Sequence, residues 1–306
     1  MVGHILELTR NGLTVHKRRG FLVIEEKGLE LGRLATEDIE AVLASSPGVS
    51  WSGTALAELA AHQIPVMFLG QNFSPIAVVL PLDGHHVQAE RFRAQADASL
   101  PLRKQAWATL VRHKIAAQAK VLDRLALPSE RVHRLAATVR SGDPSNIEAQ
   151  AAQIYWPLLL GKGFRRDRES PGANALLNYG YAILRAATAR AIVAAGLHPS
   201  LSLHHRSGGD ALALADDLME PFRPTIDLVV HDLMAAGVEK VEDGREALVG
   251  CMSADFPTRN GATPLSHVLT RLSQSLAQSF LDRKLSLAFP SHPIPLEASD
   301  DDQVLQ

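Results

Sequence analysis

The stretch "LHHRSGGDALALADDLMEPFRP", residues 203–224, places metal-binding types of side chain among leucines and alanines. Asp217 and Glu220 are three residues apart, so a helix would bring both carboxylates to one face, whereas Asp216 would point elsewhere. Two neighbouring carboxylates repel each other unless a cation lies between them, and their hard oxygen atoms suit Mg²⁺ or Mn²⁺. The spacing therefore suggests a metal site, although an exposed acidic helix face is the more common reason for it.

Two adjacent histidines precede these acids, and only one of them can readily face the same site. His204 and His205 lie in "HHRSGG", where Gly208 and Gly209 allow the chain to bend sharply. Such a bend would turn one imidazole toward the start of the helix that carries Asp217. The histidine pair thus strengthens the interpretation of the acids as metal ligands.

A third ligand has to come from elsewhere in the chain, and Glu148 is the candidate. It is the only acid between Asp143 and Asp167, and it lies at the start of the apolar run "IEAQAAQIYWPLLL". The alternative is a capping box: Ser145 and Glu148 have the S-x-x-E spacing, in which the glutamate only bonds the Ser145 backbone N–H, worth about 0.5–2 kcal/mol. The residues alone favour the capping box, so their chemistry does not assign Glu148 to a metal.

The formal net charge of −2 conceals a strong asymmetry along the chain. Residues 91–168 hold fifteen Lys or Arg and six Asp or Glu, a balance of +9, so the remainder carries −11. A basic stretch in a near-neutral protein indicates a local surface for a polyanion, because Lys and Arg gain binding free energy by replacing counterions on phosphates. A set of solvated helix faces would explain the same charges equally well.

Two kinds of structure must position these residues. Up to about residue 80, short Val-, Ile- and Leu-rich runs alternate with turns such as Asn-Gly and Pro-Gly, and "GTALAELAAHQ" has helical spacing. Beyond that point, long runs have the apolar period of helices, at 101–126, 129–140, 145–160, 172–195, 210–236 and 263–287. We therefore predict an α+β protein with a small β-rich domain over 1–82, a linker over 83–100, a larger all-α domain over 101–290 and a disordered acidic tail over 291–306.

Several common kinds of site are absent from the sequence. It contains no P-loop, G-x-G-x-x-G, H-E-x-x-H or G-x-S-x-G motif, so nucleotide hydrolysis, zinc proteolysis and serine esterase chemistry have no support. The single cysteine, Cys251, excludes an intramolecular disulfide and a multi-cysteine zinc site. No apolar run reaches the roughly 20 residues that span a bilayer, and the N-terminus lacks the layout of a signal peptide, so we expect a cytoplasmic protein without a membrane segment.

Three blocks of the chain resemble one protein family. They are "SNIEAQAAQIYWPLLLG", "NALLNYGYAILRAATARAIVAAGLHPSLSLHHRS" and "LADDLMEPFRPTIDLVV". Their order and spacing resemble those of the CRISPR-associated integrases, the core nuclease subunit of the spacer-acquisition complex, in the subgroup that accompanies single-effector type II systems. The resemblance covers nearly all of the chain. One departure is Ser202, where the family more often has Gly, but a small residue is kept.

The resemblance implies a catalytic site that binds a divalent metal, Mg²⁺ or Mn²⁺. Glu148 matches the glutamate of the family's first block, His205 the histidine that closes the second, and Glu220 the acid of the third. These three residues would bind the metal. Asp217 matches a further acid that would assist them, and His204 does not fall on the position of the family's histidine.

The resemblance also implies a reaction and partners. The 3′-hydroxyl of a short incoming DNA would attack a phosphodiester at the edge of a CRISPR repeat, and water in its place would give nuclease activity. The implied partners are double-stranded DNA, as spacer precursor and as repeat array, a small ferredoxin-like adaptation protein, and a second copy of the chain that binds through the β-rich domain.

Several side chains near the candidate ligands have expected places of their own. The basic residues around the predicted site are the candidates for DNA phosphate contacts, and they are Lys162, Arg165, Arg166 and Arg206. Tyr155 and Trp156 are expected to be core aromatics rather than base-stacking groups.

Two other functions remain open. A metal-dependent nuclease that trims or repairs branched DNA without integration would use the same residues. A non-catalytic DNA-binding scaffold would explain the basic stretch but not the three ligand-bearing blocks. A strand-joining assay with a repeat-bearing target separates these functions from integration.

Overall fold

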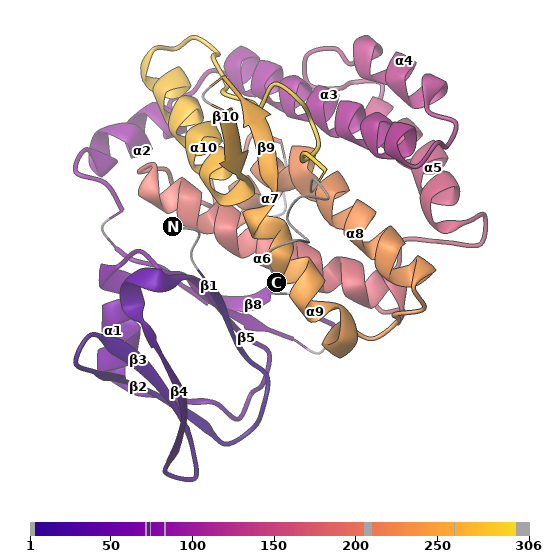
Figure 1. The fold of residues 1–306 in the computed structure, drawn as a ribbon. Coiled ribbons are helices and arrows are strands. Elements are labelled where there is room, and N and C mark those ends of the chain that lie inside the picture. The colour runs from indigo at the N-terminus through magenta and orange to yellow at the C-terminus, as the bar shows by residue number, and fades with distance from the viewer. Residues whose placement is uncertain are drawn as a thin grey trace.

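The computed structural model describes residues 4–70, 72–73, 75–82, 84–204, 210–259 and 261–297 of the chain. Strands make up the N-terminal part and helices most of the remainder, as Figure 1 shows. This arrangement confirms the predicted α+β class, in which a small β-rich unit precedes a larger helical one.

Two four-stranded sheets form the N-terminal part, with the strand orders β4-β3-β2-β6 and β1-β5-β7-β8. The helix expected from "GTALAELAAHQ" is present as α1 (Gly53–Ala61), and its N-cap Ser52 accepts a hydrogen bond from the Ala55 N–H. The strands are β1 (His4–Leu8), β2 (Leu13–Arg18), β3 (Phe21–Glu26), β4 (Leu29–Ala35), β5 (Ile39–Ala44), β6 (Ser50–Trp51), β7 (Val66–Leu69) and β8 (Pro75–Val79).

Strand β5 lies between two cores. Val42 packs in the core of the β-rich part, whereas Ala41 and Leu43 belong to the core of the helical part. Successive side chains of a strand point to opposite faces, so a strand with a core on each face is apolar along nearly its whole length. The run "IEAVLA" therefore joins the two parts of the molecule.

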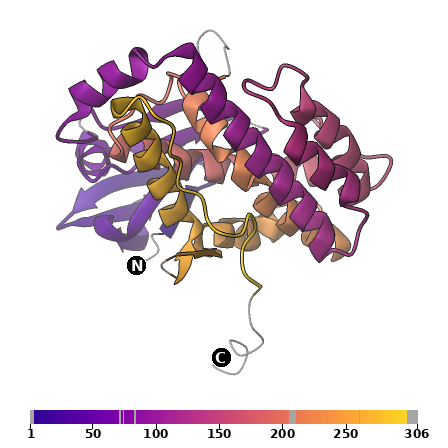
Figure 2. The same ribbon diagram turned by 90° about the horizontal axis from the view of Figure 1, so that it is seen from above.

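The helical part surrounds α6 (Ala173–Ala194), which is almost entirely buried and contacts α7, α8, α9 and α10. Seen from above, α3 crosses this part with α4 and α5 on one side (Figure 2). In the described part of the chain, no helix combines the length and the hydropathy needed to cross a membrane. The other helices are α2 (Gln88–Ala96), α3 (Leu100–Arg124), α4 (Glu130–Thr138), α5 (Ile147–Leu160), α7 (Ala213–Met219), α8 (Arg223–Ala235), α9 (Val241–Gly250) and α10 (Leu265–Leu281).

The structure differs from the sequence prediction at three places in the helical part. The stretch 83–100, predicted as a linker, contains α2. The helix expected over 210–236 is divided into α7, the short 3-10 helix η2 (Glu220–Phe222) and α8, because Pro221 has no backbone N–H to donate. A two-stranded hairpin of β9 (Asp255–Thr258) and β10 (Gly261–Pro264) interrupts the otherwise helical domain.

The stretch predicted as a disordered tail begins with an ordered segment. Ile294 is buried, and the Leu296 N–H bonds the Asp255 carbonyl oxygen of β9 at 2.8 Å. These contacts anchor the chain up to residue 297, which is the end of the described residues.

Candidate active site around Glu148 and Glu220

The first turn of α5 directs Glu148 toward α3. The Asp143 carboxylate caps this turn, because it accepts hydrogen bonds from the Ile147 N–H at 2.9 Å and from the Glu148 N–H at 3.0 Å. The Glu148 carboxylate bonds the Lys114 ammonium instead of closing a capping box on Ser145. The capping box is therefore the wrong explanation of Glu148, and its carboxylate is available to a site between helices.

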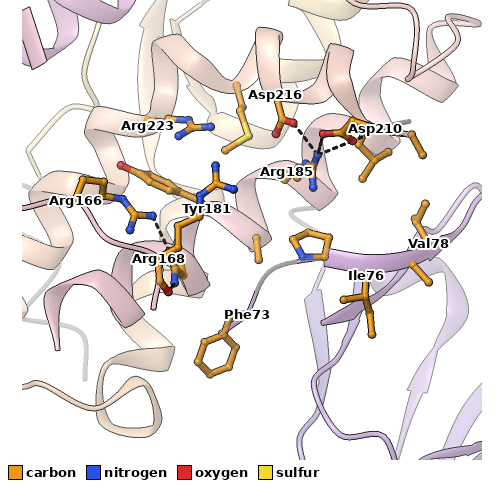
Figure 3. A pocket seen from close by; sticks show the side chains of 17 residues that line it. Phe73, Ile76, Val78, Arg166, Arg168, Tyr181, Arg185, Asp210, Asp216 and Arg223 are labelled. Atoms are coloured by element: carbon orange, nitrogen blue, oxygen red, sulfur yellow. Dashed lines mark hydrogen bonds and ion pairs between the residues drawn. The ribbon is translucent and has the colours of Figure 1, made fainter. Parts of the chain in front are cut away.

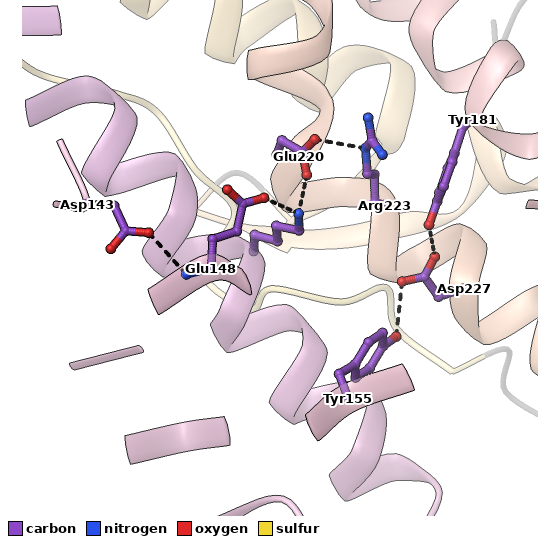
Figure 4. A network of polar contacts seen from close by, with 8 residues as sticks. Asp143, Glu148, Tyr155, Tyr181, Glu220, Arg223 and Asp227 are labelled. Carbon is purple, nitrogen blue, oxygen red and sulfur yellow. Dashed lines mark hydrogen bonds and ion pairs between the residues drawn. The ribbon is translucent and has the colours of Figure 1, made fainter. Parts of the chain in front are cut away.

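Lys114, from the middle of α3, joins the two predicted glutamates. Its Nζ lies 2.5 Å from Oε1 of Glu148 and 2.5 Å from Oε2 of Glu220. The other oxygen of Glu220 lies 3.1 Å from Nε of Arg223. Burial acts to lower the pKa of Lys114, but the charges of Glu220 and Glu148 outweigh burial and raise it, so the amine stays charged. Two of the three predicted metal ligands therefore converge on one cation (Figure 4).

The Asp217 carboxylate binds the backbone just before His205. It is fully buried on α7, and its Oδ2 accepts hydrogen bonds from the backbone N–H groups of Leu203 at 2.6 Å and His204 at 3.1 Å. The His204 ring stacks on Trp107 of α3, with 4.4 Å between the ring centroids. Asp217 thus fixes the backbone immediately before the predicted histidine ligand, while the neighbouring imidazole packs against an aromatic ring.

A buried hydrogen-bond network lies beside the glutamates. Asp227, on α8, accepts hydrogen bonds from the hydroxyl groups of Tyr155 and Tyr181 (Figure 4). Burial raises the pKa of Asp227 to about 7, although both hydroxyls and Arg223 act to lower it. Tyr155 is fully buried, as expected of a core aromatic, and Trp156 packs against the edge of the same core. The network connects α5, α6 and α8 and so fixes these helices relative to one another beside the site.

The predicted phosphate contacts fall into two structural groups. Lys162 and Arg165 are exposed just after the C-terminal end of α5. Arg166 turns inward, and its guanidinium donates hydrogen bonds of 2.9 and 2.6 Å to the side-chain oxygens of Asn174 and Asn178. Arg166 therefore ties the loop after α5 to the first turns of α6, whereas the Lys162 and Arg165 side chains are exposed.

A pocket of about 620 Å³ adjoins the glutamates through Arg223. It opens between β8 and the helical domain, and Ile76 and Tyr181 form part of its lining (Figure 3). Because Arg223 contacts Glu220 and also lines the pocket, an anion bound there would lie next to the carboxylates. Among the described residues, four arginines line the pocket: Arg166, Arg168, Arg185 and Arg223.

Arg185 binds the acids that lie off the face of the glutamates. One of its terminal nitrogens lies 2.9 Å from Oδ2 of Asp210 and 2.6 Å from Oδ2 of Asp216. Asp216 therefore points to the pocket, as its position on the helix relative to Asp217 predicts. The sequence analysis did not single out Arg185 as a site residue. Its position as a charged residue inside the apolar run 172–195 could have indicated a role.

Lys114 was also missed from the sequence, and helical spacing could have found it. It follows Trp107 by seven residues and Val111 by three, and both of these residues are buried. Residues three, four and seven apart share one face of a helix, so Lys114 lies on the buried face of α3. A charged side chain in that position needs charged partners.

Two of the predicted ligands have donor atoms that suit a divalent metal. Glu148 and Glu220 offer hard oxygen atoms that already converge on one cation, as a shared Mg²⁺ or Mn²⁺ would require. His205, the third predicted ligand, and Arg206, a predicted phosphate contact, lie outside the described residues. Within the described ranges, no three His, Cys, Asp or Glu side chains are close enough to hold a metal ion.

The chain is similar to known proteins over most of its length. The family model for the CRISPR associated protein Cas1 matches residues 6–255. A CRISPR-associated endonuclease Cas1 from Neisseria meningitidis serogroup C (strain 8013) is 38% identical over 237 residues, which are 77% of this chain and 77% of that protein.

Two solved structures have the same fold. A casposase bound to integration product matches with a TM-score of 0.82 at 20% identity, over 98% of this chain and 97% of that one. A chain of a Cas6-RT-Cas1–Cas2 complex matches with a TM-score of 0.75 at 18% identity, over 92% of this chain and 35% of that one. The family match spans both Glu148 and Glu220, and with the identity to the Neisseria protein it shows that the chain belongs to the Cas1 family of CRISPR-associated endonucleases.

Proposed function

We propose that this protein is a metal-dependent DNA integrase and endonuclease that inserts short foreign DNA into a CRISPR repeat array. The observation that carries the proposal is the convergence of Glu148 and Glu220 on one cation, 2.5 Å from an oxygen of each. Membership of the Cas1 family supports the class of reaction. The casposase of the same fold, bound to its integration product, supports strand joining rather than hydrolysis alone.

The proposed reaction exchanges one phosphodiester for another. The 3′-oxygen of the incoming DNA bonds to a phosphorus at the edge of a repeat, and the bond from that phosphorus to a 3′-oxygen of the repeat strand breaks. The proton of the attacking hydroxyl ends on the released 3′-oxygen. One phosphodiester forms for each that breaks, so the step needs no nucleotide hydrolysis, which agrees with the lack of a P-loop motif in the sequence. Water in place of the hydroxyl gives the endonuclease reaction.

Residues of this chain have distinct roles in the proposal. Glu148, Glu220 and His205 bind Mg²⁺ or Mn²⁺, which when bound polarises a phosphoryl oxygen and favours loss of the proton from the attacking hydroxyl. Arg223 holds Glu220 from the side opposite Lys114 by its ion pair of 3.1 Å. Asp217 assists as a positioning acid, because it fixes the backbone that precedes His205.

The arginine-lined pocket is the proposed path of the DNA strand to the metal site. Its volume of about 620 Å³ is large enough for a nucleotide, and guanidinium groups bind phosphate oxygens in pairs. Its exposed Ile76 offers an apolar wall beside these charges. The outer phosphates would then contact Lys162 and Arg165, together with Arg206.

The proposed assembly is a homodimer that binds double-stranded DNA and a small ferredoxin-like adaptation protein. The β-rich part is the proposed dimer contact. The Cas6-RT-Cas1–Cas2 complex, which contains a chain of the same fold, supports an adaptation partner. Light scattering tests the dimer, and a mass of one chain at micromolar concentration would contradict it. A cytoplasmic location is part of the proposal, because the proposed target is a repeat array in cellular DNA.

A strand-joining assay tests the proposed function. A labelled short duplex with free 3′-hydroxyl ends is incubated with a repeat-bearing plasmid in Mn²⁺, and joined products are separated by size. We expect joining by the wild type and none by Glu148→Gln or Glu220→Gln, whereas Glu239→Gln, a change at an exposed acid, should join normally. A donor with 3′-deoxy ends should abolish joining but leave nicking intact.

Two results would contradict integration. Cleavage of branched DNA with no joined product would favour a nuclease that does not integrate. DNA binding without any product in Mn²⁺ or Mg²⁺ would favour a non-catalytic scaffold.

A further inference from the structure

A charged lysine is buried at the place where the proposed metal would bind. The Lys114 side chain is 13% exposed, and its Nζ bridges Glu148 and Glu220 at 2.5 Å from each. Lys120, on the same helix, shows the ordinary situation: its side chain is 40% exposed and pairs with Asp123 at 3.0 Å within the helix. Burial of an ammonium group is unfavourable without paired charges, so the two glutamates hold Lys114 in this position.

Among the described residues, the two carboxylates that Lys114 joins are paired with two cations. Glu148 and Glu220 carry two negative charges, and Lys114 and Arg223 carry two positive ones. A divalent cation on the same carboxylate oxygens would add two positive charges beside the ammonium and the guanidinium. Like charges a few ångströms apart in a partly buried site repel strongly. The metal and the ammonium therefore compete for one place.

In the described part of the chain, Asp227 is a further carboxyl group close to Lys114. Asp227 is close enough for its pKa to respond to the charge of Lys114. Both oxygens of that carboxyl group, however, already accept hydrogen bonds from Tyr155 and Tyr181. The long flexible stem of lysine lets the ammonium move without any change in the helix. The anion that the proposed reaction itself brings to this place is a DNA phosphate.

We propose that Lys114 is an exchangeable counter-ion of the two glutamates. It neutralises Glu148 and Glu220 while no metal is bound, and after a metal has displaced it, its ammonium binds a phosphate of the DNA. This inference rests on the proposed function. It makes the two ligands cooperative: the metal releases the ammonium for DNA, and DNA, by holding the ammonium, favours the metal. Such coupling is reciprocal by thermodynamic linkage.

The Mn²⁺ affinity of the metal-free, full-length protein without DNA tests the displacement. Lys114→Met keeps the length of the side chain and removes its charge, and we expect it to bind Mn²⁺ at least about tenfold more tightly than the wild type, because no ammonium has to leave. Lys120→Met, the matched control on α3, should bind Mn²⁺ as the wild type does. If Lys114 only held the two glutamates in place, Lys114→Met should bind Mn²⁺ more weakly than the wild type, because the two repelling carboxylates would lose their shared partner.

DNA affinity tests the coupling. With a donor that lacks its 3′-hydroxyl, so that no joining occurs, Mn²⁺ should increase the DNA affinity of the wild type and increase that of Lys114→Met by a smaller factor. Circular dichroism checks that the variant folds without metal. If it does not, Lys114→Gln, whose amide still donates hydrogen bonds to the glutamates, replaces it in both titrations.

The two proposals fail in different ways. Unchanged or weaker Mn²⁺ binding in a folded Lys114 variant would overturn the inference and leave the proposed function standing. If the wild type has no Mn²⁺ site that Glu148→Gln removes, the proposed function falls and the inference falls with it.

Discussion

Replacement of Asp217 by Asn tests how the segment before His205 is held. The Asp217 carboxylate is fully buried and accepts the N–H groups of Leu203 and His204 at 2.6 and 3.1 Å. An Asn side chain has the same shape but carries no charge, and its NH₂ group cannot accept a hydrogen bond. Hydrogen bonds to a charged group contribute about 1.5–3 kcal/mol each, and Asn keeps one neutral acceptor, so we expect the free energy of unfolding to fall by about 2–3 kcal/mol.

The same substitution should weaken metal binding, because it would displace the backbone that precedes His205, a proposed metal ligand. Loss of a residue that orients a metal ligand typically lowers metal affinity about 10–100-fold, and we expect that loss for Mn²⁺ in Asp217→Asn. Urea unfolding followed by tryptophan fluorescence measures stability, since the His204 ring stacks on Trp107. Calorimetric titration measures Mn²⁺ binding, with Asp232→Asn, at a side chain 64% exposed on α8, as the control. Wild-type stability and wild-type Mn²⁺ affinity in Asp217→Asn would refute this reasoning.

Three further predictions concern single side chains. His205→Ala should abolish strand joining and His204→Ala should retain most of it; the reverse result in a joining assay would show that the other histidine faces the metal. Arg165→Ala should flatten the log–log salt dependence of duplex binding by about one unit at unchanged stability, whereas Arg166→Ala should lower the free energy of unfolding by about 1–3 kcal/mol, because its guanidinium bonds two buried amide side chains. An unchanged slope in Arg165→Ala would place the DNA path elsewhere. Burial raises the pKa of Glu40 from 4.5 to about 7, so the folded state keeps a proton there that the unfolded state has released. Stability should therefore fall as the pH rises between these values, and Glu40→Gln should flatten this part of the curve of urea midpoint against pH.

Periodicity was enough to predict most of the fold, because the helices and strands bury regular faces. Strand β5 reads as an apolar run since it has a core on each side, and α6 reads as apolar on all sides since other helices surround it. The hairpin of β9 and β10 was not predictable in this way. Each of its strands is four residues long and contains a proline, so neither has the alternating pattern of a strand. Ile294 is similar, because an acidic, proline-bearing stretch gives no sign that one residue fills a hydrophobic site.

Several contacts of the candidate site depend on tertiary packing, which residue spacing does not reveal. Ser145 and Glu148 have the spacing of a capping box. In the structure the Asp143 carboxylate caps the start of α5 instead, so the Glu148 side chain is not used as a cap. The buried face of α3 could be read from spacing, but the anions that meet Lys114 depend on how α5 and η2 pack against that helix. Arg166 has the charge expected of a phosphate contact, and its asparagine partners become visible only in the folded chain.

Anomalous X-ray scattering from crystals grown with Mn²⁺ tests the central claim most directly. The account predicts one strong manganese peak bonded to an oxygen of Glu148 and an oxygen of Glu220, with an imidazole nitrogen of His205 as a further ligand. It also predicts that Nζ of Lys114 has left the position between the two carboxylates that it holds at 2.5 Å from each. A manganese peak elsewhere in the molecule, or no peak at saturating Mn²⁺ with Lys114 still bridging the glutamates, would contradict it.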